Sequence, residues 1–319
     1  MDNIEIQDQS TKKSASYLSA FLLLFLGLFG FLAIGPYIGI LAALPFYEGD
    51  LPSIQSAILN PTQFPEAKIL VYFMQAGSTL GMVLLPAIYL FVIKKVPIKS
   101  FIPSNITVIG LLLAGVITFT FMGVNSIFIE WNAGIKLPES MAGFENWAIQ
   151  TEQFAAKLTT YLTTFTSPWQ LVGALFIMAV LPAIAEEFVF RGLLQGELQK
   201  ATRNNHVAIW ISAFLFSAIH MQFFGFVPRM LLGALFGYLY VWSGNLLIPI
   251  FAHFVNNGLT LILLYLRNTD LIDYDIENTE SSTLGSVLIF AIITIGLLFY
   301  FQRHYQRINS SNGRVAKGV

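Results

Sequence analysis

The sequence predicts an all-α, polytopic membrane protein, with about eight transmembrane helices in one bundle and a polar site inside the membrane. Composition is the first observation behind this prediction. The 319 residues are 55% hydrophobic and 11% charged, whereas soluble domains carry about a quarter charged residues. The second observation is that apolar runs longer than about 18 residues recur along the chain, which is the pattern of membrane-spanning helices.

Eight such runs define the predicted spans. They cover residues 17–44, 69–93, 105–129, 169–199, 205–226, 229–243, 246–266 and 284–302. The first run is too long for the apolar part of a signal peptide and lacks a clean cleavage site, so we interpret it as a retained helix. We therefore expect a disordered cytoplasmic N-terminus at 1–16, a transmembrane helical domain at 17–302 and a basic cytoplasmic tail at 303–319.

The basic residues between the spans are shared unevenly between the two sides. Eleven lie on one side, namely Lys12, Lys13, Lys94, Lys95, Lys99, Lys200, Arg203, Arg303, Arg307, Arg314 and Lys317. Five lie on the other, namely Lys68, Lys136, Lys157, Arg229 and Arg267. The positive-inside rule then predicts a multi-pass protein of the cell membrane with both termini in the cytoplasm and the acidic segment 270–277 outside.

Several classes of function are excluded by residues or motifs that the sequence lacks. The net charge of −1 gives no basis for binding nucleic acid, and no Walker loop or GxGxxG motif indicates a nucleotide. The chain has no cysteine, which excludes disulfides, thiolate metal sites and a cysteine nucleophile. His-Glu-x-x-His and Gly-x-Ser-x-Gly are also missing, so neither an ordinary zincin nor a serine-nucleophile elbow is predicted.

One segment outside the spans has its own pattern. Apolar residues recur at helical spacing across residues 138–165, with Glu, Gln, Asn and Thr between them. This pattern predicts an amphipathic helix at the outer membrane interface. A structural cover over the bundle is the simpler interpretation, and a gate or a docking surface for substrate is the alternative.

The fourth span carries two acids and a guanidinium at membrane depth, where ionisable groups are costly and usually mark function. Glu187 and Arg191 share a helical face and can form an ion pair. Glu186 lies about 100° around the helix axis, so it is free to face a water or a metal. Pro182 lacks a backbone N–H, so we expect a kink just before the acids. A buried pair that only joins helices is the alternative.

Two histidines lie within later spans. His220 is in the fifth span, and His253 shares a helical face with Asn257 in the seventh. A lone intramembrane histidine is more often a helix contact than a ligand, but two of them near an acid pair favour a site. At about 1.5 Å per residue, Glu186 can reach the depth of both histidines if the fourth helix continues to about Leu198.

This set of groups can activate water in two ways. A carboxylate in an apolar site can accept the proton of a nucleophilic water. Alternatively, Glu186, His220 and His253 form a set able to hold Zn²⁺ with one position open for water. Asn257 could donate to the developing oxyanion or complete the metal shell. The residues alone leave both versions open.

The three motifs, in this order, resemble those of the CPBP family of intramembrane proteases, also called the CAAX protease and bacteriocin-processing (Abi) family. Glu-Glu-x-x-x-Arg corresponds to Glu186, Glu187 and Arg191, Phe-x-x-x-His to Phe216 and His220, and His-x-x-x-Asn to His253 and Asn257. The resemblance covers a catalytic core at about 165–266. Any one motif is weak evidence, whereas the ordered set on successive apolar spans is specific.

The resemblance implies an eight-helix core in which Glu186, His220 and His253 surround a catalytic water. Asn257 would assist them, and Arg191 would support Glu187. The implied activity is endopeptidase cleavage of membrane-associated proteins or peptides, by a metal-dependent or a metal-free glutamate mechanism. Two alternatives remain: a non-enzymatic immunity or scaffold protein of the same fold, and a transporter that uses a Glu/His relay.

Overall fold

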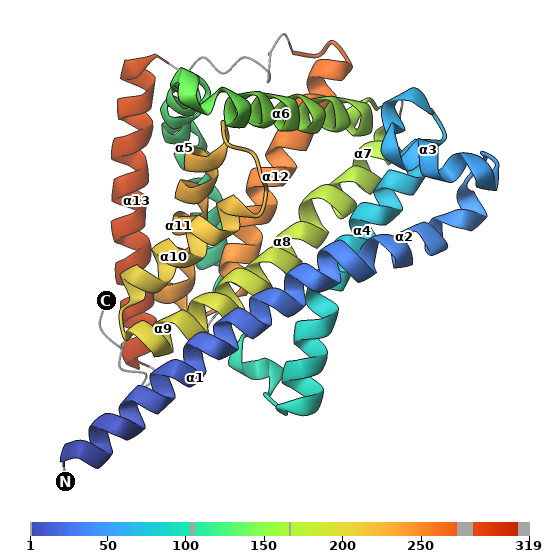
Figure 1. The fold of residues 1–319 in the computed structure, drawn as a ribbon. Helices are drawn as coiled ribbons and strands as arrows, with labels where there is room; N and C mark the ends of the chain where they lie inside the picture. Colours follow the sequence, from blue (N-terminus) through green and yellow to red (C-terminus); the bar gives the residue numbers. More distant parts are fainter. Residues whose placement is uncertain (1, 103–105, 166, 273–282, 312–319) are drawn as a thin grey trace.

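The computed structural model describes residues 2–102, 106–165, 167–272 and 283–311, and for residues 2–13 and Ser311 it describes the backbone alone. These residues form helices and connecting turns, without a strand. The α-helices are α1 (Asp2–Phe29), α2 (Gly35–Ala43), α3 (Ile54–Leu59), α4 (Ala67–Ala87), α5 (Val108–Ala133), α6 (Ala142–Thr163), α7 (Pro168–Ala174), α8 (Leu181–Glu187), α9 (Gly196–Thr202), α10 (Asn205–Ala218), α11 (Phe226–Ser243), α12 (Leu247–Asn268) and α13 (Leu284–Ser311) (Figure 1).

Seven helical stretches in the described part of the chain are long and apolar enough to cross a membrane. They are Ser14–Phe46, Ala67–Ile93, Val108–Ala133, Pro168–Thr202, Phe226–Ser243, Leu247–Asn268 and Leu284–Ser310. The predicted all-α, polytopic fold is therefore confirmed. Seven of the eight predicted spans correspond to these stretches, including the long fourth helix on which the meeting of the site residues depends.

The remaining predicted span, the fifth at 205–226, is shorter than expected. Its helix α10 has 14 residues and ends at Ala218, which gives about 21 Å against a hydrocarbon core of about 30 Å. Met221 then adopts a positive φ of 56°, and the chain turns back to enter α11 with Pro228 in its first turn. The sequence did not predict this turn, because the residues around it are mostly apolar. Non-helical backbone is tolerated at such depth where it lines a protein cavity, and this one does.

The two ends of the chain differ from the predicted boundaries. Helix α1 begins at Asp2, where a disordered segment to residue 16 was predicted. No Pro or Gly occurs in that segment, so nothing in it interrupts the helical hydrogen bonds. Helix α13 continues past residue 302 to Ser311. Most of the acidic segment 270–277 and the end of the basic tail lie outside the described residues.

Turns of π-helix interrupt the fourth span on both sides of the acids. They cover Leu175–Val180 and Phe188–Gln195, with the short α8 between them. The first widened turn comes just before Pro182, where the sequence predicted a kink, because the proline ring leaves no room for an ordinary helical hydrogen bond. Such π-helical turns are frequent at functional sites.

Helices α1 and α2 contact α4 through glycines, so their backbones touch. A Cβ on Gly35 would lie 2.4 Å from the carbonyl oxygen of Gly77, and one on Gly30 would lie 2.0 Å from that of Gly81. Small residues at both surfaces allow this approach, as is common between membrane helices. This contact holds the first two spans together at one side of the bundle.

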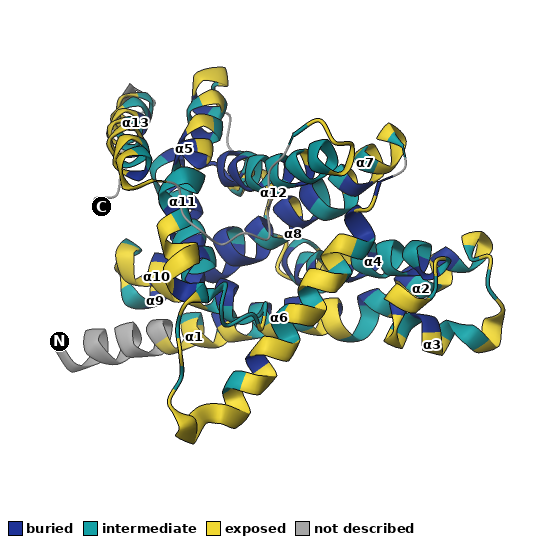
Figure 2. Cartoon of the chain, turned by 90° about the horizontal axis from the view of Figure 1, so that it is seen from above, coloured by how far each residue is buried: buried dark blue, intermediate teal, exposed yellow. Residues whose placement is uncertain are grey.

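The fourth span lies at the centre of the bundle and α13 at its edge. In the most apolar 18-residue part of each span, 44% of the residues are buried for Pro168–Thr202 and 17% for Leu284–Ser310. Seen from above, buried residues gather where α8, α11 and α12 face one another (Figure 2). Of the motif residues, Glu187, Arg191, Phe216 and His253 are buried there, whereas Glu186, His220 and Asn257 are partly exposed.

Helix α6 crosses one end of the bundle at a steep angle to the other long helices (Figure 1). It confirms the helix predicted across 138–165, and it lies opposite the end at which α1 begins and α13 finishes. The first and last helices thus have their outer ends on the same side. That this side is cytoplasmic stays a prediction.

Candidate active site

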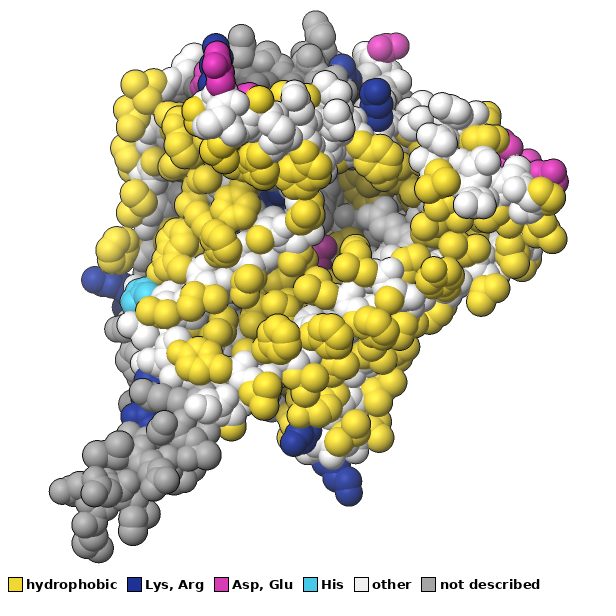
Figure 3. Space-filling view, in the orientation of Figure 1, with side chains coloured by type: hydrophobic (Ala, Val, Ile, Leu, Met, Phe, Trp, Pro, Cys, Tyr) yellow, Lys and Arg dark blue, Asp and Glu magenta, His cyan; other side chains and the backbone are white. Residues whose placement is uncertain are grey.

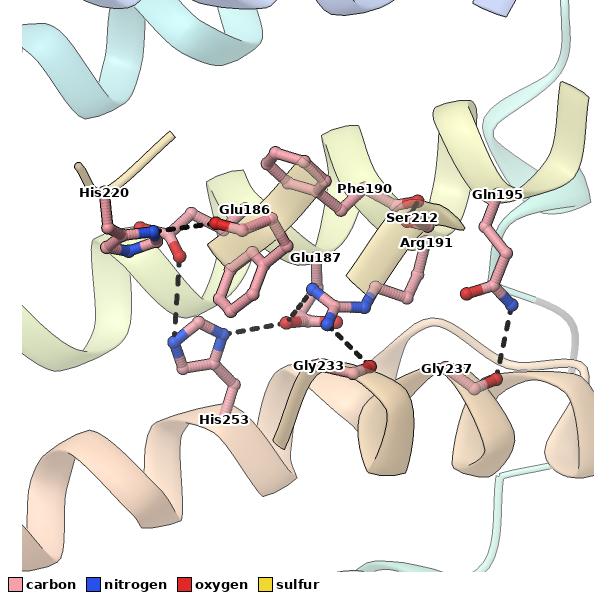
Figure 4. A network of polar contacts seen from close by, with 11 residues as sticks. Glu186, Glu187, Phe190, Arg191, Gln195, Ser212, His220, Gly233, Gly237 and His253 are labelled. Atoms are coloured by element: carbon pink, nitrogen blue, oxygen red, sulfur yellow. Dashed lines mark hydrogen bonds and ion pairs between the residues drawn. The ribbon is translucent and has the colours of Figure 1, made fainter. Parts of the chain in front are cut away.

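Glu187 and Arg191 form the ion pair that their spacing predicts. Arg191 Nη1 donates to Glu187 Oε1 over 2.9 Å, and both side chains are almost fully buried. Arg191 Nη2 also donates to the carbonyl oxygen of Gly233 over 2.9 Å, which links the fourth span to α11 (Figure 4). The pair compensates its own charge and joins two helices.

The guanidinium of Arg191 can approach α11 closely because a glycine, Gly233, lies opposite it. A Cβ on Gly233 would lie 3.2 Å from Arg191 Nη2. One turn further along, Gln195 Nε2 donates to the carbonyl oxygen of Gly237 over 3.3 Å. The ring of Phe216 lies under the guanidinium, 4.6 Å from Arg191 Cζ. The phenylalanine of the second motif therefore packs against the cation, a favourable contact in a desolvated site.

His253 lies between the two acids. Its Nδ1 is 2.8 Å from Glu187 Oε1, and its Nε2 is 3.9 Å from Glu186 Oε2. The acceptor at Glu187 favours the tautomer with the proton on Nδ1, which leaves the lone pair of Nε2 on the side of Glu186. The ring also stacks on Phe236, with centroids 5.3 Å apart. Glu187 therefore sets the orientation of the imidazole.

His220 follows the end of α10 instead of lying within a helix. Its Nδ1 is 2.8 Å from the carbonyl oxygen of Phe216, so the same reasoning places the proton on Nδ1 and leaves Nε2 as an acceptor. In Figure 4 it lies beside Glu186. Both histidines thus hold Nδ1 against an oxygen and keep Nε2 available.

A cavity of about 660 Å³ joins four of the predicted residues. Glu186, His220, His253 and Asn257 all line it, whereas Glu187 and Arg191 lie behind its wall. Figure 3 shows the surface hollowed below α6, with acidic and basic side chains visible among hydrophobic ones. The convergence on one pocket that the motifs predicted is therefore present in the structure.

Asn257 is held by its neighbours at the wall of the cavity. Its Nδ2 donates to the carbonyl oxygen of Met178 over a long 3.4 Å, and its Oδ1 accepts from Asn256 Nδ2 over 3.0 Å. The weak bond to Met178 leaves amide N–H capacity that a ligand in the cavity can use.

Sequence reasoning missed other polar residues of this cavity, notably Arg229, Gln222 and Glu152. Arg229 was counted with the basic residues between spans, although it begins the run 229–243, and an ionisable group there is itself a signal. Glu152 was one of several polar residues of the amphipathic segment. Nothing in the sequence distinguished it from its solvent-facing neighbours.

Glu186, His220 and His253 are residue types that bind zinc, but the distances between them do not suit a zinc site. A ligating histidine usually donates its other N–H to an oxygen, as His220 and His253 do here. Yet within the described part of the chain, no three His, Cys, Asp or Glu side chains come close enough together to hold a metal ion. As they lie in the structure, these side chains do not form a metal site.

The fold and the site define a class: a helical membrane protein with an acid, two imidazoles and an amide around a buried cavity. Comparison with known proteins shows what one part of this chain is similar to. Residues 168–259 match the family described as Type II CAAX prenyl endopeptidase Rce1-like, and this segment contains all three motifs. The resemblance to CAAX proteases is thereby confirmed over this region.

Two curated relatives are each similar to about a quarter of the chain. The uncharacterized protein YpbD of Bacillus subtilis is 32% identical over 85 residues, which are 25% of this chain and 40% of that protein. The membrane-embedded CAAX protease MroQ of Staphylococcus aureus is 32% identical over 94 residues, 28% of this chain and 38% of that protein. The chain thus spans about two fifths of each relative, and no solved structure matches it.

Proposed function

We propose that this protein is an intramembrane endopeptidase that hydrolyses peptide bonds of membrane-associated proteins or peptides. One observation carries the proposal: Glu186, the two histidines and Asn257 face a single cavity inside an apolar bundle. The family match over 168–259 supports it, and so does the printed name of the staphylococcal relative. No observation favours a transporter or a non-enzymatic scaffold over this function.

The proposed reaction begins with a water between Glu186 and the histidines. The carboxylate of Glu186 accepts one proton of that water as the oxygen attacks the carbonyl carbon of the scissile bond. Nε2 of His220 accepts a hydrogen bond from the remaining O–H and aligns the attacking lone pair. Glu186 is suited to this role because Arg191 neutralises the adjacent Glu187 and leaves the charge of Glu186 without a close partner.

The oxyanion that forms needs a donor. Nδ2 of Asn257 supplies an N–H from the cavity wall, and such a preorganised donor acts strongly where water is excluded. The proton held by Glu186 then passes to the leaving amine nitrogen, the C–N bond breaks, and the carboxylate is restored. His253, oriented by Glu187, presents the lone pair of its Nε2 to the same water from the other side.

In the alternative version, Glu186, His220 and His253 would hold a zinc ion, which would supply Lewis-acid chemistry to the same water. It requires these side chains to move closer together than they are here. The residues are shared between the two versions, so changes to them do not separate the versions. Metal content and chelation do.

A reporter peptide anchored in the membrane tests the proposed activity. We expect Glu186→Gln, which keeps the shape but removes the base, to lower kcat by about 10²- to 10⁴-fold. Glu197→Gln is the matched control, because Glu197 lies further along the same helical stretch and pairs with the exposed Lys200. Cleavage undiminished in Glu186→Gln would overturn the proposal.

A further inference from the structure

Arg229 is a cation of the cavity that the proposed mechanism does not use. Among the described residues lining the cavity it is the one Lys or Arg. It lies in the first turn of α11, and its Nη2 donates to Gln222 Oε1 over 2.7 Å. Its Nη1 is buried without a hydrogen-bond partner. A buried donor without an acceptor costs free energy. A ligand that brings an acceptor to Nη1 of Arg229 would therefore be stabilised.

Glu152 faces the same space from α6. Its Oε2 is also buried without a partner, and its charge interacts with that of Arg229. Even so, the side chains of Glu152 and Arg229 form no ion pair within 4.0 Å. Burial raises the pKa of Glu152, and the guanidinium of Arg229 lowers it in part. Two side chains of opposite charge thus line one cavity with no ion pair between them.

The buried, unpartnered Nη1 of Arg229 favours a carboxylate as the ligand. A guanidinium binds a carboxylate through two parallel N–H donors, which adds geometric selection to charge. Ile129, Phe224 and Leu232 are among the residues that line the same cavity and offer apolar contact. Arg229 also interacts electrostatically with Glu186, so a group bound there remains within the field of the site.

We propose that Arg229 is a specificity-determining residue that binds a carboxylate group of the substrate, and that Glu152 of α6 competes for it. The proposal rests on the endopeptidase function above. The carboxylate of Glu152 occupies one side of the place that the substrate carboxylate takes.

Binding to a cleavage-deficient protein tests the assignment without requiring turnover. The protein carries Glu186→Gln in lipid nanodiscs, and the probes are a fluorescent peptide of apolar residues with a free terminal carboxylate and its amidated twin. We expect the acid to bind about 10- to 100-fold more tightly than the amide, the range for hydrogen bonds to charged groups. Arg229→Gln should abolish that difference and leave the affinity of the amide unchanged.

Glu152→Gln supplies the second arm. Removing the competing carboxylate should tighten the acid peptide several-fold and leave the amide as it was. Lys157→Gln on the exposed face of α6 and Glu139→Gln just before it are matched controls for charge, and neither should alter the preference. Equal binding of acid and amide to the protein with Arg229 intact overturns the proposal, as does equal weakening of both peptides by Arg229→Gln.

Failure of this inference and failure of the endopeptidase function give different results. If the intact protein cleaves the anchored reporter but does not discriminate acid from amide, the function stands and the role of Arg229 is wrong. If the acid is preferred in binding but nothing is cleaved, Arg229 is a carboxylate site in a protein of another function. An active protein should show the preference in KM, with kcat of the two peptides alike.

Discussion

The buried pair between Glu187 and Arg191 gives the sharpest stability prediction. Glu187 is 0% exposed and Arg191 is 1% exposed, and the free oxygen of the acid, Oε2, is buried without a partner. In Arg191→Met the apolar volume is largely kept, but Glu187 retains its charge with only the His253 contact. Removing one partner of a buried pair costs about 3–5 kcal/mol, so we expect a large loss of stability.

A double-mutant cycle separates this charge effect from lost packing. Glu187→Gln with Arg191→Met removes both charges, so the double variant should be more stable than the sum of the two single losses by about 1–3 kcal/mol. The assay is thermal unfolding of the purified protein in one lipid composition, with Lys200→Met as a control for an exposed cation. Additive losses, or an Arg191→Met protein as stable as the parent, would refute the reasoning.

Three further predictions concern packing, the oxyanion and metal. Gly35→Ala should destabilise the protein by about 1–3 kcal/mol, because its Cβ overlaps the backbone at Gly77, whereas Gly296→Ala, with open space around it, should not lower the unfolding temperature. Asn257→Ala should lower kcat by about 10²- to 10³-fold with little change in KM; steady-state kinetics on the reporter show this, and an unchanged kcat excludes the oxyanion role. Reporter cleavage should survive dialysis against a chelator, and an activity that is lost and then restored by Zn²⁺ would favour the metal version instead.

Local spacing predicted the parts of the site that lie on one helix. The separation of Glu187 and Arg191 fixes a shared face, and the structure has that pair. The adjacent Glu186 had to point elsewhere because neighbouring residues are about 100° apart on a helix. The convergence of His220 and His253 with Glu186 could be tested only as a matter of depth, and the long fourth span made it possible.

What the sequence did not predict depends on contacts between distant segments. Helix α10 ends at Ala218, where the chain turns. Many residues of that turn are apolar, so a prediction from hydropathy extended the span to residue 226. Glu152 and Arg229 lie 77 residues apart in the numbering of the chain, and they share a cavity only because the fold brings α6 and the start of α11 together around it. No periodicity within either segment carries that information, because a helical pattern defines a face but not the partner of that face.

The adjacent acids Glu186 and Glu187 have different roles, which one acid could not combine. An acid that compensates Arg191 and orients His253 has its oxygens turned towards other helices, and it cannot also face the cavity. An acid that faces the cavity as a base must keep a lone pair free of any strong donor. On a helix, adjacent positions separate these two requirements by about 100° at almost the same depth. The histidine between them couples the two, since Nδ1 contacts Glu187 and Nε2 faces Glu186. If this is correct, Glu187→Gln should impair cleavage without removing the base, and Glu186→Gln should remove the base without loosening the link between the fourth span and α11.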